Sequence, residues 1–134
     1  MSDAEFLAAF EAGVLEPARF RHHEHLRAAW LCLRHAATPA AGLERFVAGL
    51  RRFAAAVGKP GLYHETITWA FLLLIRERMA LGPEAEDFAA FRARNPDLFT
   101  WNPSVLDRYY RRETLDSALA RVVFLLPDRL QALP

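Results

Sequence analysis

Apolar positions along the chain recur with helical spacing, and no stretch alternates polar and apolar residues as a half-buried strand does. A first helix is expected at residues 3–12, because Ser2 and Glu5 form a capping-box pattern and Gly13 is typical of a helix end. Pro, Gly and capping residues divide the rest of the chain in the same way. Further helices are expected at about residues 19–37, 39–58, 64–80, 84–94 and 114–126, with a short one opening at Asn102-Pro103.

The helix expected at residues 64–80 differs from the others because its apolar residues leave almost no polar face. The stretch from Ile67 to Ile75 contains a single hydroxyl-bearing residue, Thr68. A helix that is apolar all round is typical of the centre of a domain. The sequence therefore predicts an all-α fold: a compact, single-domain helical bundle of about six or seven helices over residues 1–134, with residues 64–80 at its centre.

Composition limits the classes of function and site. The 134 residues are 53% hydrophobic and 25% charged, with a net charge of +1, which is typical of a soluble globular domain and gives no reason to expect a nucleic-acid partner. Cys32 is the single cysteine, so an intrachain disulfide and a cysteine-based zinc site are excluded. The acidic start, MSDAEF, does not resemble a secretory signal, and the longest apolar run is too short to span a bilayer. A cytoplasmic protein without a membrane partner is expected.

Three of the five histidines lie in the segment Arg21-His-His-Glu-His25, at the start of the second expected helix. At 100° per residue, His22 and His25 point toward the core, whereas His23 and Glu24 point toward solvent. Residues three apart on a helix share a face, so two imidazoles are close enough to bind one ion. The alternative is that they are buried histidines, hydrogen-bonded to their neighbours.

A second polar cluster opens the most apolar helix, where Tyr63, His64 and Glu65 precede two threonines, Thr66 and Thr68. Polar side chains at the head of a buried helix need partners. His64 is a candidate third ligand to a metal held by His22 and His25, which would leave an open position for water or substrate. Glu65 and Tyr63 are candidate catalytic residues that would move protons, and the threonines are candidate contacts to water or a ligand.

Each of these residues also has a structural interpretation. His64 is equally explained as a helix cap or as a buried, hydrogen-bonded histidine. Glu65 suits the first turn of a helix for electrostatic reasons, and Tyr63 suits a core position with its hydroxyl at the edge. The sequence leaves these alternatives open.

The pattern Phe20-x-His22-x-x-His25-Leu-x-x-Ala-Trp, followed by Tyr63-His64-x-Thr66-x-Thr68, resembles a family of small uncharacterised bacterial helical proteins. The resemblance covers about residues 20–110 and implies that the histidines at positions 22, 25 and 64 recur, whereas position 65 varies. There is also a looser likeness to DinB-like bundles, which hold a metal with three histidines from different helices. The resemblance implies sites rather than an activity.

Two functions follow as expectations. The first is a metal-binding protein, with zinc, iron, copper or nickel held by His22, His25 and His64, that acts as a small metal-dependent enzyme on a small molecule. The second is a metal-free helical module that binds a small molecule or another protein, with the histidines in a buried polar cluster. A homodimer formed through exposed helix faces is a third alternative.

Overall fold

The computed structural model describes residues 1–129, and every regular element in that range is helical. The fold is therefore all-α, as the sequence predicts. Eight α-helices and three short 3-10 helices occur in the described residues. In chain order they are α1 (Asp3–Ala12), η1 (Pro17–Arg19), α2 (His22–Arg34), α3 (Pro39–Ala56), η2 (Pro60–Leu62), α4 (Glu65–Leu81), α5 (Phe88–Arg94), α6 (Pro96–Phe99), η3 (Val105–Arg108), α7 (Arg112–Leu115) and α8 (Ala118–Val122).

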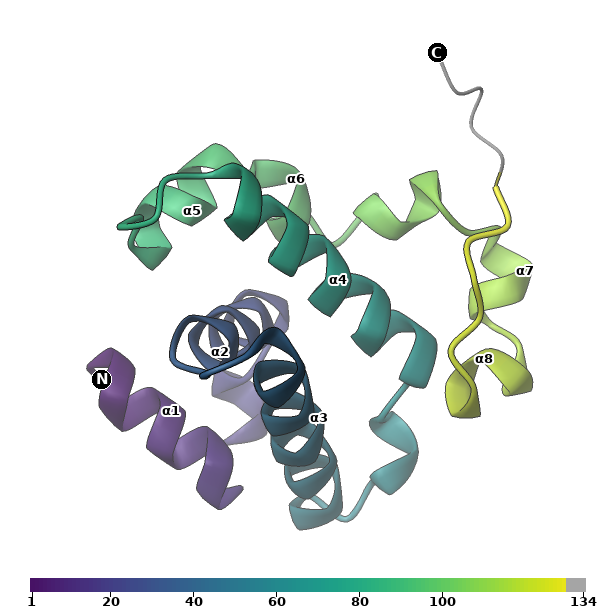
Figure 1. Ribbon diagram of the computed structural model, residues 1–134. Helices are drawn as coiled ribbons and strands as arrows, with labels where there is room; N and C mark the ends of the chain where they lie inside the picture. The colour runs from purple at the N-terminus through teal and green to yellow at the C-terminus, as the bar shows by residue number, and fades with distance from the viewer. Residues whose placement is uncertain (130–134) are drawn as a thin grey trace.

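Helix α4 is the centre of the architecture (Figure 1). Helices α1, α2 and α3 pack against one another and form one group, and α4 crosses this group in contact with α2 and α3. Helices α5 and α6 lie near the C-terminal end of α4, whereas α7 and α8 lie near its N-terminal end. Leu72 and Ile75 of α4 are fully buried, so the prediction of a central apolar helix is confirmed. No described helix has the length and apolarity needed to cross a membrane.

The first group of helices is tightly packed, and one contact shows how closely. A Cβ atom at Gly49 of α3 would lie 2.4 Å from the ring of Phe10 on α1. Only glycine therefore allows α1 to approach α3 at this point. Phe10 in turn packs on Phe20 and Phe46, so the aromatic cluster extends to the loop that precedes α2.

The helix ends follow local capping chemistry. The expected capping box is present: the Ser2 hydroxyl accepts from the Glu5 N–H, the Glu5 carboxylate accepts from the Ser2 N–H, and Gly13 ends the helix with φ 72°. The helix expected from residue 19 begins later, at His22, because the Glu24 carboxylate accepts from the N–H of Arg21 and fixes the start there.

The C-terminal region differs from the expected helix over residues 114–126. Two short helices, α7 and α8, replace it, because the Ser117 hydroxyl accepts from the N–H of Ala120 and starts a new helix. After Val122 the chain is not helical and runs as an extended segment, residues 123–129, beside α7 and α8 (Figure 1). The short helix expected from Asn102-Pro103 is also displaced, since α6 ends before these residues and η3 begins after them.

Candidate functional site

His22 and His25 line one small cavity between α2, α3 and α4, as the helical wheel predicts. The cavity has a volume of about 50 Å³, and we call it the histidine cavity. Thr68 of α4 is the third polar side chain in its wall, and the rest is apolar, including Phe46 and Phe71. A space of this size holds one or two water molecules or a single ion, but no organic substrate.

The His22 ring connects the histidine cavity with α6 and with the loop that follows it. Its Nε2 atom donates a hydrogen bond of 2.8 Å to the carbonyl oxygen of Leu98. The ring centroid lies 5.2 Å from that of Phe71 and 5.0 Å from that of Trp101, which is largely exposed. Burial lowers the pKa of His22, against the opposing effect of its hydrogen bond to Leu98.

His25 lies deeper, with its ring centroid 4.1 Å from that of Phe20. Burial lowers the pKa of His25 to about 4, and repulsion from a charge on His22 acts in the same direction. A hydrogen bond to the backbone of Phe20 and the charge of Glu24 oppose these effects without cancelling them. His25 is therefore a neutral imidazole at pH 7.

His23 shows that α2 is covered on a side that the sequence assigned to solvent. Its Nδ1 atom lies 2.8 Å from the Glu24 carboxylate, as expected for a solvent-facing pair. The ring nevertheless packs against Phe88 and Phe99, with centroids 5.6 Å away in both cases. Phe88 belongs to α5 and Phe99 to α6, and these two helices leave His23 half-buried. A helical wheel of α2 cannot predict this, because it contains no information about where other helices pack.

His64 caps a helix and does not line the histidine cavity. Its Nδ1 atom accepts a 3.1 Å hydrogen bond from the N–H of Ile67 and so forms the N-cap of α4. Its Nε2 atom donates a 2.8 Å hydrogen bond to the carbonyl oxygen of Leu115, the last residue of α7. Both ring nitrogens are thus bound to backbone groups.

The structure therefore brings together two of the three expected metal ligands. Within residues 1–129 no group of three or more His, Cys, Asp or Glu side chains is arranged to hold a metal ion. The three-histidine arrangement of His22, His25 and His64 is not formed, because the backbone partners of His64 fix its ring at the junction of α4 and α7.

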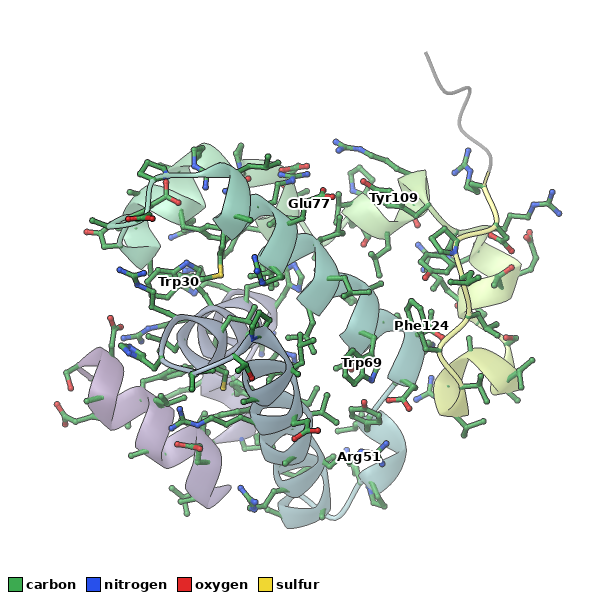
Figure 2. All side chains as sticks on the ribbon, viewed as in Figure 1. Trp30, Arg51, Trp69, Glu77, Tyr109 and Phe124 are labelled. Atoms are coloured by element: carbon green, nitrogen blue, oxygen red, sulfur yellow. The ribbon has the colours of Figure 1, made fainter. Side chains whose placement is uncertain are left out.

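The expected catalytic pair, Tyr63 and Glu65, forms a hydrogen-bonded cluster outside the histidine cavity. The Tyr63 hydroxyl donates to Glu65 Oε1 at 2.5 Å, and Trp69 Nε1 donates to the same oxygen at 3.0 Å. The guanidinium of Arg51 lies 3.8 Å from this oxygen and 4.2 Å from the centroid of the Tyr63 ring. Arg51 on α3 and Trp69 on α4, both labelled in Figure 2, thus approach Glu65 from two helices.

Burial and the hydrogen bond to Glu65 raise the pKa of Tyr63 well above its ordinary value. The phenol therefore keeps its proton, and the Glu65 carboxylate is already engaged by two donors. The arrangement joins α3, η2 and the start of α4.

The two threonines of the second polar cluster have different roles. Thr66 is fully buried, and its hydroxyl donates toward the carbonyl oxygens of Ala120 and Val123 while it accepts from the N–H of Leu125. It therefore binds the C-terminal segment rather than a ligand. Thr68 alone lines the histidine cavity. Cys32 is buried as expected, and burial raises the pKa of its thiol to about 12.

A larger pocket, which the sequence did not reveal, lies on the other side of α4. We call it the α4 pocket. It has a volume of about 290 Å³ and is formed by α4, η3 with the two tyrosines that follow it, and the segment after α8. Its wall is largely apolar and includes Leu73, Leu74 and Phe124, and Glu77 and Tyr109 add polar groups. Figure 2 shows Glu77, Tyr109 and Phe124 around the space between α4 and the C-terminal elements.

One feature of the sequence explains the apolar wall that α4 gives this pocket. A helix at the protein surface normally has polar residues on the face opposite the core. In α4 this face carries Leu73 and Leu74 instead. Leu73 is 46% exposed, so the C-terminal elements cover this face only in part. The pocket is the uncovered remainder of an apolar helix face.

Comparisons with protein-family models, with curated proteins and with solved structures found no match to this chain. The resemblance to a bacterial helical family therefore stays a prediction.

Proposed function

We propose that the protein binds a small, largely apolar molecule in the α4 pocket. The observation that carries this proposal is the pocket itself: a concave, mainly apolar space of about 290 Å³ with the polar groups of Glu77, Tyr109 and Tyr110 at its wall. Small-molecule sites typically combine apolar walls with a few polar groups, and their volumes begin at about 300 Å³. The histidine cavity, at about 50 Å³, is too small for this role.

The form of the pocket favours a small molecule over a protein partner. Protein interfaces are broad and bury roughly 800 Å² on each partner, whereas the apolar residues here surround a single concave space. Tyr110 closes the inner side of that space, because it is almost fully buried and its hydroxyl donates to the carbonyl oxygen of Leu125 at 2.7 Å. A compact apolar group of a ligand fits such a space.

The first test uses 2-phenylethanol as a neutral probe of the pocket. We expect weak, saturable binding that shifts the backbone amide signals of pocket residues in a two-dimensional NMR titration. Leu73→Gln should weaken this binding about fivefold, because it removes roughly 1 kcal/mol of apolar contact while preserving helix propensity.

Leu62→Gln is the matched control, because Leu62 is similarly exposed, at 57%, but lies on η2 outside the pocket. It should leave the affinity for 2-phenylethanol as it is in the wild type. Shifts confined to residues away from α4, or equal affinities for wild type and Leu73→Gln, would contradict the proposal.

A second candidate function is the binding of one divalent metal ion by His22 and His25. The observation that favours it is that both imidazoles line the same small cavity and lie three residues apart on α2. Water molecules and the hydroxyl of Thr68 would complete such a site. This candidate retains the metal expected from the sequence but omits His64, whose two nitrogens have backbone partners.

Calorimetric titration with zinc, nickel or copper salts separates this site from the three-histidine arrangement. If His22 and His25 hold the metal, His22→Ala and His25→Ala should each weaken metal binding by at least about tenfold. Even the loss of a residue that only hydrogen-bonds to a metal ligand typically weakens the metal affinity by about that factor. His64→Asn, which keeps a capping side chain, should bind the metal as the wild type does. An equal loss of metal affinity in all three variants would support the three-histidine site instead. If the wild type binds none of these metals, the proposal of a metal site is wrong.

A further inference from the structure

Glu77 gives the α4 pocket a negative charge that no basic side chain offsets within its wall. Among the described residues that line the pocket, Glu77 is the only one of the acidic type Asp or Glu, and none is Arg or Lys. Glu77 also takes part in none of the ion pairs found in residues 1–129. Its carboxylate is therefore available to a ligand.

Two arginines flank Glu77 along α4, Arg76 and Arg78; neither lines the pocket, and Arg78 is already paired. Its guanidinium donates to both carboxylate oxygens of Asp97, at 3.0 and 2.9 Å, and to the side-chain oxygen of Asn95. A second carboxylate, that of Asp128, acts on the pocket wall from outside it. Burial is the larger cause of the raised pKa of Tyr110, and the negative charge of Asp128 raises this pKa further. Within the pocket wall itself Glu77 has no basic counterpart, although the whole chain is close to neutral.

The aromatic residues of the pocket wall also favour a positively charged ligand. Tyr109 and Phe124 present π systems to the pocket, and the face of an aromatic ring attracts a cation. An anionic ligand would be repelled by Glu77, and a neutral one would use only the apolar wall. A ligand with an apolar body and a protonated amine would use the wall, the rings and the carboxylate together.

We infer that the ligand of the α4 pocket is a small amphiphilic amine, whose apolar body packs between α4 and the C-terminal segment and whose ammonium group binds Glu77. This inference rests on the proposed function, since it names the chemical class of the molecule that the same pocket binds. Tyr109 is the second polar contact, and its hydroxyl is a hydrogen-bond acceptor for the ammonium. The partial exposure of the pocket leaves the charged end close to solvent, as an amine requires.

Three probes of nearly equal size test this inference: 2-phenylethylamine, which is protonated at neutral pH, 2-phenylethanol, and the anion phenylacetate. We expect the amine to bind about five- to tenfold more tightly than the alcohol, because a partly desolvated ion pair and a cation–π contact each contribute a factor of a few. Phenylacetate should bind more weakly than the alcohol. Added salt should reduce the advantage of the amine.

Glu77→Gln should bring the ratio of amine to alcohol affinity down to about two or three, since it removes the ion pair, keeps the shape and leaves the cation–π contact. Glu44→Gln is the matched control, because it removes an exposed carboxylate from α3, outside the pocket, and should keep the ratio of the wild type. The ratio is measured by NMR titration of each variant with both probes.

The outcomes separate this inference from the proposed function. If the amine and the alcohol bind equally well and Leu73→Gln weakens both, the pocket binds small molecules but the inferred ligand class is wrong. If Glu44→Gln lowers the ratio as much as Glu77→Gln does, the preference is a general charge effect and the inference is overturned. If neither probe binds the wild type, the proposed function fails and the inference fails with it.

Discussion

Acid is expected to destabilise the protein as the pH falls from about 6.5 to about 4, because the unfolded chain takes up a proton at His25 that the folded chain does not. The pKa of His25 is lowered from 6.5 to about 4 in the folded state, chiefly by burial. Stability from this residue is therefore complete above pH 6.5 and is lost as the pH falls toward 4. A difference of this size corresponds to at most about 3 kcal/mol. His22, whose pKa is lowered by the same cause, acts in the same direction.

Urea unfolding at a series of pH values, in the presence of a chelator, measures this loss directly. His25→Gln cannot take up the proton, so its free energy of unfolding should fall much less between pH 6.5 and pH 4.5. His35→Gln is the control, because it removes an exposed histidine at the end of α2 and should keep the wild-type dependence. An identical pH dependence in wild type and His25→Gln would show that the histidine cavity does not hold a buried, neutral imidazole.

The second large effect is expected at His64, which ties the start of α4 to the end of α7. His64→Ala should lower the free energy of unfolding by about 2–3 kcal/mol, because it removes the cap on Ile67 and leaves the carbonyl oxygen of Leu115 without its donor. His64→Asn restores a capping acceptor but does not reach Leu115, so it should recover about 1 kcal/mol. Urea denaturation at pH 7.5 gives both values.

The same experiment separates the capping role of His64 from a role as a metal ligand. The capping role requires the same loss of stability with and without a chelator, and a smaller loss for Asn than for Ala. A loss that vanishes when the wild type is also measured in chelator would mean that His64 contributes through a bound metal. Equal losses for Asn and Ala would mean that the cap contributes nothing.

Local chemistry made part of the fold predictable from the sequence. The first helix has the expected bounds because Ser2 and Glu5 cap its first turn and Gly13 ends it, each through bonds to residues close in the sequence. The central position of α4 was also predictable, since its composition leaves no polar face. The long helix expected at the C-terminus was wrong, because Ser117 starts a new helix and Thr66, more than fifty residues earlier, fixes the chain beyond it.

The candidate sites divide in the same way between local and long-range causes. The shared face of His22 and His25 follows from helical spacing, which the sequence contains. The position of His64 depends on its hydrogen bond to Leu115, which is far away in the sequence. A histidine at the start of a helix can cap the helix, bind a metal or form a buried hydrogen bond, and the sequence does not distinguish these roles. The α4 pocket depends on how the chain around Tyr109 and Phe124 returns to α4, so no local pattern predicts it.

A crystal structure of the protein with 2-phenylethylamine tests the central claim most directly. The proposal predicts the aromatic ring of the ligand in the α4 pocket, against Leu74 and Phe124, with its ammonium nitrogen at about 2.7–2.9 Å from a carboxylate oxygen of Glu77. A ligand bound elsewhere on the protein, or a pocket closed by its own side chains in crystals that contain the amine, would contradict it.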